Sequence, residues 1–302
     1  MTWDDPLITY LLDFLFELEK NGLKTPLIIA GGFGLFLKRR YLAERQERTL
    51  FSNMPGARST EDIDIFAQRN TLCDIQQAQS IKDALSRLQY EVIEAEKYMQ
   101  WKKTINIGTQ TGTIKIDFLV GNVDAYRSYL HIEQGRNPRR ARHPRVEGFH
   151  ARITKEALLI DEKAQKIPLS GIRTSGETHD TTICVPHPFT YLLMKLFAFR
   201  DRQEKLQKQQ TQYHAFDIFL IIGLLTESEL HEAIEFGKHY AEEPIVQEAK
   251  RIIADHFTGT PSDGMVAIKS HPSFSANFEA KHYSEFEQIL MEVFNGEPTR
   301  KN

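Results

Sequence analysis

The spacing of apolar residues changes at residue 188, and this change constrains the fold more than any other feature of the chain. Over the first 120 residues, short apolar runs of strand length alternate irregularly with segments of helical spacing, which is typical of a mixed α and β domain. From residue 188 onward the spacing is helical. We therefore expect an α+β protein in three parts: a mixed α and β domain over residues 1–125, a connecting segment with a basic loop and short strands over residues 126–186, and a helical part over residues 187–302.

Charge and cysteine content narrow the functional class. The 302 residues carry 38 Lys and Arg against 41 Asp and Glu, so no global basic field attracts nucleic acid or membrane. The two cysteines form no disulfide framework or thiolate zinc motif. The first 20 residues contain acids where a signal peptide has positive charge, and no run of about 18 apolar residues occurs. We expect a cytoplasmic protein with no membrane partner.

A glycine pair follows the first apolar run. The sequence PLIIA at residues 26–30 has the length and composition of a strand, and it leads directly into Gly31 and Gly32 and then into a helical segment with a basic outer face. Glycine lets the backbone approach a ligand closely, and the helix N-terminus offers unpaired N–H groups to phosphate. A glycine pair alone more often marks only a turn.

Three aspartates lie in two further predicted strands. Asp62 and Asp64 alternate with apolar residues in EDIDIF, so their side chains share one face of the strand, and Asp117 lies in the apolar strand KIDFLVG. A solvent-exposed strand is the simpler interpretation of the first pair. However, an unpaired buried carboxylate is costly, and carboxylates near substrate phosphates suit Mg²⁺. Together with the glycine pair, the three aspartates favour a metal site.

These motifs resemble those of the polymerase-β-type nucleotidyltransferase superfamily, and most closely the AbiEii-type enzymes, which include MenT toxins of toxin–antitoxin systems. The matching stretches are GGFGLFLK, RSTEDIDIF and IKIDFLVG. The resemblance implies a mixed sheet with flanking helices as the catalytic domain. It also implies that Asp62 and Asp64 ligate two Mg²⁺ ions, one bound to the triphosphate of an NTP co-substrate and one catalytic, that Asp117 completes the catalytic metal site, and that Gly31 and Gly32 cradle phosphate.

The resemblance extends to Arg58 and Thr60 in the first motif, which would bind the nucleotide. In the helical part, the stretch HPFTYLLMKLFAFRDRQEKLQKQQTQYHAFDIFLI is similar to the family at Lys195, Arg200 and Asp217. Lys195 would then neutralise the triphosphate, and Asp217 would orient either Lys195 or the acceptor. The alternatives are structural: Arg58 and Thr60 as loop residues, Lys195 extending to the surface from a helix flank, and Asp217 as a helix cap.

The sequence departs from the family pattern after the glycine pair, where many relatives have Ser or Thr. Phe33 and Gly34 occupy these positions, so phosphate binding would depend on backbone N–H groups and on Arg58 or Lys195.

The resemblance implies transfer of a nucleoside monophosphate from an NTP to an acceptor hydroxyl. The acceptor would be a tRNA 3′ end or a protein, and the chain would act as a toxin with a cognate antitoxin. The alternatives are transfer to a small molecule, as in aminoglycoside nucleotidyltransferases, and a non-catalytic nucleotide- or RNA-binding module.

Three further features have simpler interpretations. Residues 124–148 are expected to form a long loop or domain joint, and the basic stretch within them at residues 136–145 is expected to be either solvated or in contact with an RNA backbone. His187, which precedes a proline, is expected to be structural. Four phenylalanines are expected in the core of the helical part: Phe197, Phe199, Phe216 and Phe219.

Overall fold

The computed structural model describes residues 6–23, 27–52, 54–56, 62–96, 98–107, 110–133, 139–259, 261–274 and 280–296. The chain forms two compact units, and each is described by itself. The first unit contains Met1–Gly34 and Ser59–Pro186, and the second contains Leu35–Arg58 and His187–Asn302. The division falls within one helix, α2 (Gly31–Glu44).

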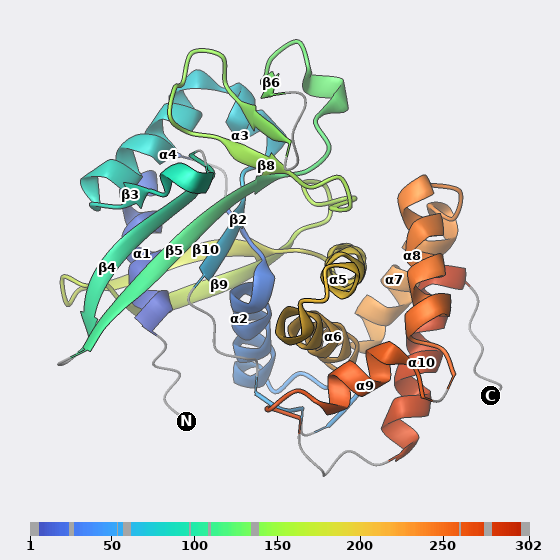
Figure 1. Ribbon diagram of the computed structural model, residues 1–302. Coiled ribbons are helices and arrows are strands. Elements are labelled where there is room, and N and C mark those ends of the chain that lie inside the picture. The colour runs from blue at the N-terminus through green and yellow to red at the C-terminus, as the bar shows by residue number, and fades with distance from the viewer. Residues whose placement is uncertain are drawn as a thin grey trace. The chain divides into compact units, whose positions relative to one another are not determined.

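The first unit is built on one mixed sheet, to which ten strands of the described chain contribute (Figure 1). The strands are β1 (Ile28–Ile29), β2 (Asp62–Phe66), β3 (Glu91–Val92), β4 (Gln100–Ile107), β5 (Gln110–Val120), β6 (His131–Glu133), β7 (Arg140–Arg142), β8 (Ala151–Ile153), β9 (Gln165–Ile172) and β10 (Thr178–Val185). Their order is β6-β7-β8-β5-β2-β1-β10-β9. β4 pairs with β5 along the same edge as β8, and β3 extends the sheet beyond β4.

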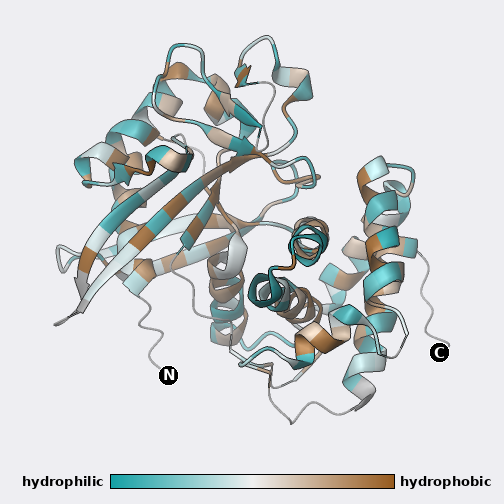
Figure 2. Ribbon diagram, in the orientation of Figure 1, coloured by the Kyte–Doolittle hydropathy of each residue, from teal (hydrophilic) through white to brown (hydrophobic). Residues whose placement is uncertain are grey.

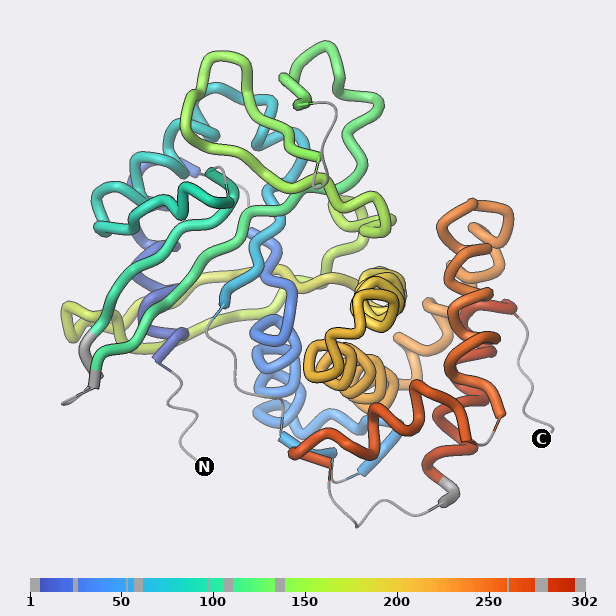
Figure 3. Tube along the Cα trace, viewed as in Figure 1, coloured from blue at the N-terminus to red at the C-terminus, as the bar shows by residue number. Residues whose placement is uncertain are grey.

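Residues alternate between two faces of this sheet, as strand geometry requires. One face is apolar and buried, with Ile63, Ile65, Ile116 and Phe118 at most 1% exposed. Figure 2 shows this alternation of hydrophilic and hydrophobic residues along β4 and β5, and Figure 3 follows the two strands side by side as a long antiparallel pair. The other face of β2 and β5 bears Asp62, Lys115 and their neighbours.

Helix α1 (Pro6–Lys20) packs on the buried face. Its apolar residues recur at helical spacing, its Phe14 meets Phe118 of β5 edge to face at 6.3 Å, and Gly171 of β9 leaves room for Leu12. The remaining helices of this unit are α3 (Arg69–Cys73), α4 (Ile75–Arg87) and the short 3₁₀ helices η1 (Glu94–Glu96) and η2 (Asp124–Tyr126). α4 contacts α1, and Asp74 caps it by accepting backbone N–H bonds from Gln76 and Gln77.

The second unit is helical. Besides most of α2 it contains α5 (Pro188–Glu204), α6 (Lys208–Gly223), α7 (Glu227–His239), α8 (Pro244–His256), α9 (Asp263–Lys269) and α10 (Ala280–Asn295). α6 packs against α5 and α9, and α10 packs against α7 and α8. Phe199, Phe216 and Phe219 are fully buried, as the sequence predicts, whereas Phe197 is half-buried under the guanidinium of Arg200. No helix in the described ranges is long and apolar enough to cross a membrane.

The α+β class and the helical residues after 187 agree with the sequence analysis, and three details differ. The glycine pair forms the first turn of α2 and not a separate turn before it. The expected connecting segment belongs to the first unit, because β6 to β10 complete its sheet. The expected loop at residues 124–148 contains β6 and β7, since Arg140 lies in a strand and is bound to Glu133.

Candidate functional site

The predicted carboxylates of β2 and β5 lie side by side. These strands pair in parallel, and the register places Asp64 opposite Asp117 and Asp62 opposite Lys115. Residues opposite each other in adjacent strands point to the same face, and residues two apart along a strand do so as well. Asp62, Asp64 and Asp117 therefore share the polar face of the sheet, two of them in direct cross-strand contact. We call this the carboxylate face.

The carboxyl group of Asp117 has a raised pKa. Burial and the negative charges of Asp64 and Asp62 raise its pKa to about 7, against the lowering effects of a hydrogen bond from Gln100 and of the nearby charge of Arg152. Gln100 Nε2 donates to Asp117 Oδ2 at 2.8 Å, whereas no donor among the described residues reaches the buried Oδ1. One oxygen is thus held in place, and the other is left for a ligand.

Gly31 allows the start of α2 to approach the carboxylates. A Cβ atom at this position would lie 1.8 Å from Asp64 Oδ2, and the backbone has φ of +63°, a conformation that favours glycine. The backbone N–H of Ala30 donates to the carbonyl of Asp64 at 2.8 Å, which fixes the end of β1 against β2. The predicted proximity of the glycine pair to the aspartates is therefore present. Gly32 follows in the same helical turn.

Asp62 has a different partner from the one expected of a metal ligand. Its Oδ1 lies 3.4 Å from Lys115 Nζ, in a half-exposed ion pair at the start of β2. Among the described residues, no group of three or more His, Cys, Asp or Glu side chains is arranged to hold a metal ion. Two observations nevertheless fit a cation: the cross-strand pair of Asp64 and Asp117, and the free Oδ1 of Asp117. Asp62 lies two residues from Asp64 on the same face, and its ion pair with Lys115 is half-exposed.

Cations flank the carboxylates on the same face. Two residues before Asp117 along β5, Lys102 of β4 lies opposite Lys115 of β5. In the opposite direction along β5, past Asp117, Arg152 of β8 lies opposite both Leu119 of β5 and Arg140 of β7. Gln100, Lys115 and Arg152 are functional candidates that the sequence did not predict. Only the register of the sheet shows which positive or amide side chains lie beside which aspartate.

The second unit brings Lys195 and Asp217 together. Lys195 Nζ donates to Asp217 Oδ2 at 2.7 Å, and the two side chains are only 9% and 1% exposed. Asp217 lies inside α6, so the alternative of a helix cap is wrong, and Lys195 does not extend to the surface. A buried ion pair of this kind is costly in desolvation and joins α5 to α6 at a defined register.

The remaining predicted residues are placed as follows. Arg58 and Thr60 lie outside the described residues. Arg200 binds Asp201 and Glu248 at the surface of the helical unit. His187 has a structural role, as expected: it caps α5, its Nδ1 accepting from the backbone N–H of Phe189.

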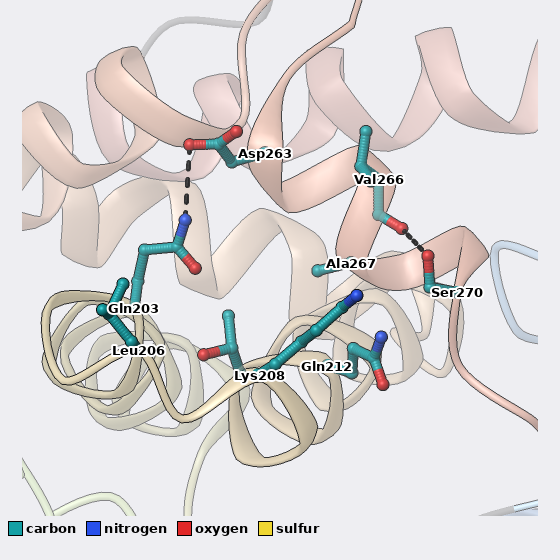
Figure 4. A pocket seen from close by; sticks show the side chains of 9 residues that line it. Gln203, Leu206, Lys208, Gln212, Asp263, Val266, Ala267 and Ser270 are labelled. Carbon is teal, nitrogen blue, oxygen red and sulfur yellow. Dashed lines mark hydrogen bonds between the residues drawn. The ribbon is translucent and has the colours of Figure 1, made fainter.

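A separate hollow of about 370 Å³ lies in the helical unit (Figure 4). It is formed by the end of α5, the start of α6 and α9, and its lining includes Gln203, Lys208 and Asp263. Figure 4 shows the amide of Gln203 directed at the carboxylate of Asp263 across this hollow. Neither Lys195 nor Asp217 lines it, so it is distinct from the predicted residues of this unit.

Comparisons with known proteins add no family. No protein-family model matches the sequence, and a search among curated proteins found no match. The residues of the carboxylate face are therefore the basis for proposing a function.

Proposed function

We propose that the chain is a Mg²⁺-dependent nucleotidyltransferase of the polymerase-β-type superfamily, similar to AbiEii-type enzymes. It would transfer a nucleoside monophosphate from an NTP to an acceptor hydroxyl and release pyrophosphate. The observation that carries this proposal is the cross-strand pair of Asp64 and Asp117 beside the glycine start of α2. Paired carboxylates next to a helix N-terminus suit a cation and a polyphosphate together.

Asp62, Asp64 and Asp117 would hold Mg²⁺. A bound Mg²⁺ would neutralise negative charge on the triphosphate during the transfer. The two ions implied by the resemblance would need all three carboxylates.

The protein groups supply positioning and proton transfer. Asp117 would accept the proton of the acceptor hydroxyl. The hydroxyl oxygen forms a bond to the α-phosphorus, and the bond from that phosphorus to the bridging oxygen breaks, so that pyrophosphate leaves. Gln100 holds Asp117 in position by its hydrogen bond.

In the helical unit, we assign Asp217 the role of orienting Lys195. The 2.7 Å contact favours this role over direct contact of Asp217 with an acceptor, because the carboxylate is 1% exposed. The candidate acceptors are a tRNA 3′ end and a protein side chain, and the candidate partner is a cognate antitoxin. The expected location is the cytoplasm.

The test is transfer of label. The protein is incubated with each α-³²P-labelled NTP, Mg²⁺ and total tRNA, and labelled RNA and labelled protein are separated on gels. We expect labelled product with the wild type and loss of at least about 100-fold in Asp64→Asn and Asp117→Asn. Asp180→Asn is the matched control, since Asp180 is an exposed aspartate of the same sheet on β10, two strands away from β2.

Three outcomes separate the alternatives. In a parallel reaction that also contains an aminoglycoside, label on the aminoglycoside but not on RNA or protein would indicate small-molecule transfer. An NTP-dependent rise in melting temperature without pyrophosphate release would indicate a binding module. Equal labelling by the wild type and both site variants would overturn the proposal.

A further inference from the structure

The side chains of the carboxylate face form rows across the sheet. The central row contains Gln100, Asp117 and Asp64 from β4, β5 and β2. Two residues farther along the strands, the next row contains Leu119 of β5, Arg152 of β8 and Arg140 of β7. Two rises of about 3.3 Å separate these rows, so Arg152 lies within reach of any group bound at Asp117.

The two arginines of this row differ in their partners. Arg140 is 9% exposed and bound to Glu133, its neighbour in β6. Arg152 keeps 35% of its side chain exposed, and within the described ranges the carboxylate in ion-pair distance is that of Glu96, at 3.8 Å. A half-exposed ion pair at this distance contributes little to the stability of the fold. The guanidinium of Arg152 is therefore available to an additional anion.

Cross-strand like charges are destabilising unless something compensates them. Arg152 directly faces Arg140, and both lie on the face that carries Asp117. The fork of an arginine matches two oxygens of a phosphate group and binds them bidentately. Glu133 already offsets the charge of Arg140, so an anion of this type would offset mainly the charge of Arg152.

We propose that Arg152 is a phosphate-binding residue of the carboxylate face. Its ligand is a phosphate group beside the carboxylates, supplied either by the triphosphate of an NTP or by the backbone of an RNA acceptor. The choice of an NTP or an RNA as the source of this phosphate group rests on the proposed function. Binding of the phosphate group by Arg152 can be measured without nucleotide transfer. Arg140 is not assigned to the phosphate group, because its guanidinium is bound to Glu133.

The experiment measures binding to the full-length protein with Mg²⁺ present. One arm titrates inorganic tripolyphosphate, and the other titrates a short single-stranded RNA without NTP. The variants are Arg152→Gln and Arg152→Lys, and the control is Arg87→Gln. Arg87 is also an arginine paired with a carboxylate, Glu17, but it lies on α4, which packs with α1. Melting curves establish that each variant is folded.

We expect Arg152→Gln to weaken one ligand about tenfold, and Arg152→Lys to restore part of the loss. Loss in the tripolyphosphate arm assigns Arg152 to the NTP. Loss in the RNA arm, with a salt dependence reduced by about 0.7 in log–log slope, assigns it to the acceptor. Identical affinities of Arg152→Gln and Arg87→Gln in both arms would overturn the inference.

The two proposals fail in different ways. If tripolyphosphate binding depends on Arg152 but no nucleotide is transferred, only the proposed function is wrong. If the wild type transfers nucleotide while Arg152→Gln binds both ligands normally, only the role of Arg152 is wrong.

Discussion

Asp117 connects the stability of the chain to its proposed chemistry. Its pKa of about 7 exceeds the ordinary value of 3.8 because the carboxyl group is buried beside Asp64. Between these two pH values the folded chain holds a proton that the unfolded chain has lost. The free energy of unfolding therefore falls as pH rises from about 4 to 7 and stays low above 7.

The first prediction concerns Asp117→Asn. The amide has no charge to bury, so the variant should be more stable than the wild type at pH 8, by up to about 4 kcal/mol, and similar to it near pH 4. Urea denaturation in the presence of EDTA at both pH values measures this difference. A stability difference that does not depend on pH would contradict the assignment of the raised pKa to Asp117.

The second prediction concerns Gly31→Ala. The new Cβ would collide with the carboxylate of Asp64 and would also require φ of +63°. Gly176→Ala is a matched control, because Gly176 has φ of +84° but no atom within 4 Å of its Cβ position. We expect a loss of about 1 kcal/mol in the control and about 3 kcal/mol or more in Gly31→Ala, measured by urea denaturation. Equal losses would mean that Asp64 does not pack against Gly31.

At the scale of elements, the buried ion pair of α5 and α6 gives a prediction on stability. Lys195→Met or Asp217→Leu alone leaves an uncompensated buried charge and should cost about 3–5 kcal/mol, whereas the double variant should cost much less. Denaturant unfolding of the four proteins forms a double-mutant cycle. Additive losses would show that the two charges do not stabilise each other.

The same double variant separates structure from function. If Lys195 acts on the triphosphate, the double variant should be folded but defective in nucleotide transfer. A folded double variant with full transfer activity would restrict the pair to a structural role.

The sequence predicted the helices and strands that carry clear apolar spacing, and it predicted which aspartates share a face of their strand. It could not predict register. The pairing of Asp64 with Asp117, and the position of Arg152 beside them, depend on contacts between segments more than 30 residues apart. For the same reason, β7 was expected to be a loop: its arginines look solvated until Glu133 is placed opposite Arg140.

At the scale of the whole molecule, the helical unit is discontinuous in sequence. Residues 35–58 belong to it, because Lys38 binds Glu229 at 2.8 Å in a buried pair and Phe51 packs against Phe219 with ring centroids 5.9 Å apart. The expected boundary at residue 187 therefore marks only one of the points at which the chain passes between units.

A truncation tests this discontinuity. A fragment of residues 187–302 lacks Lys38 and Phe51, leaves Glu229 without its cation and exposes part of the apolar core. We expect it to melt without a cooperative transition, whereas addition of a peptide of residues 35–58 should restore helical circular dichroism. A fragment that unfolds cooperatively on its own, with no response to the peptide, would contradict the division into these units.

The central claim is that Asp64 and Asp117 share a divalent cation. Diffraction from crystals grown with Mn²⁺ and a non-hydrolysable NTP analogue, recorded at the manganese edge, tests it most directly. We predict an anomalous peak at roughly 2.0–2.2 Å from a carboxylate oxygen of each residue, including the free Oδ1 of Asp117. Bound nucleotide with no peak between these two carboxylates would contradict the account.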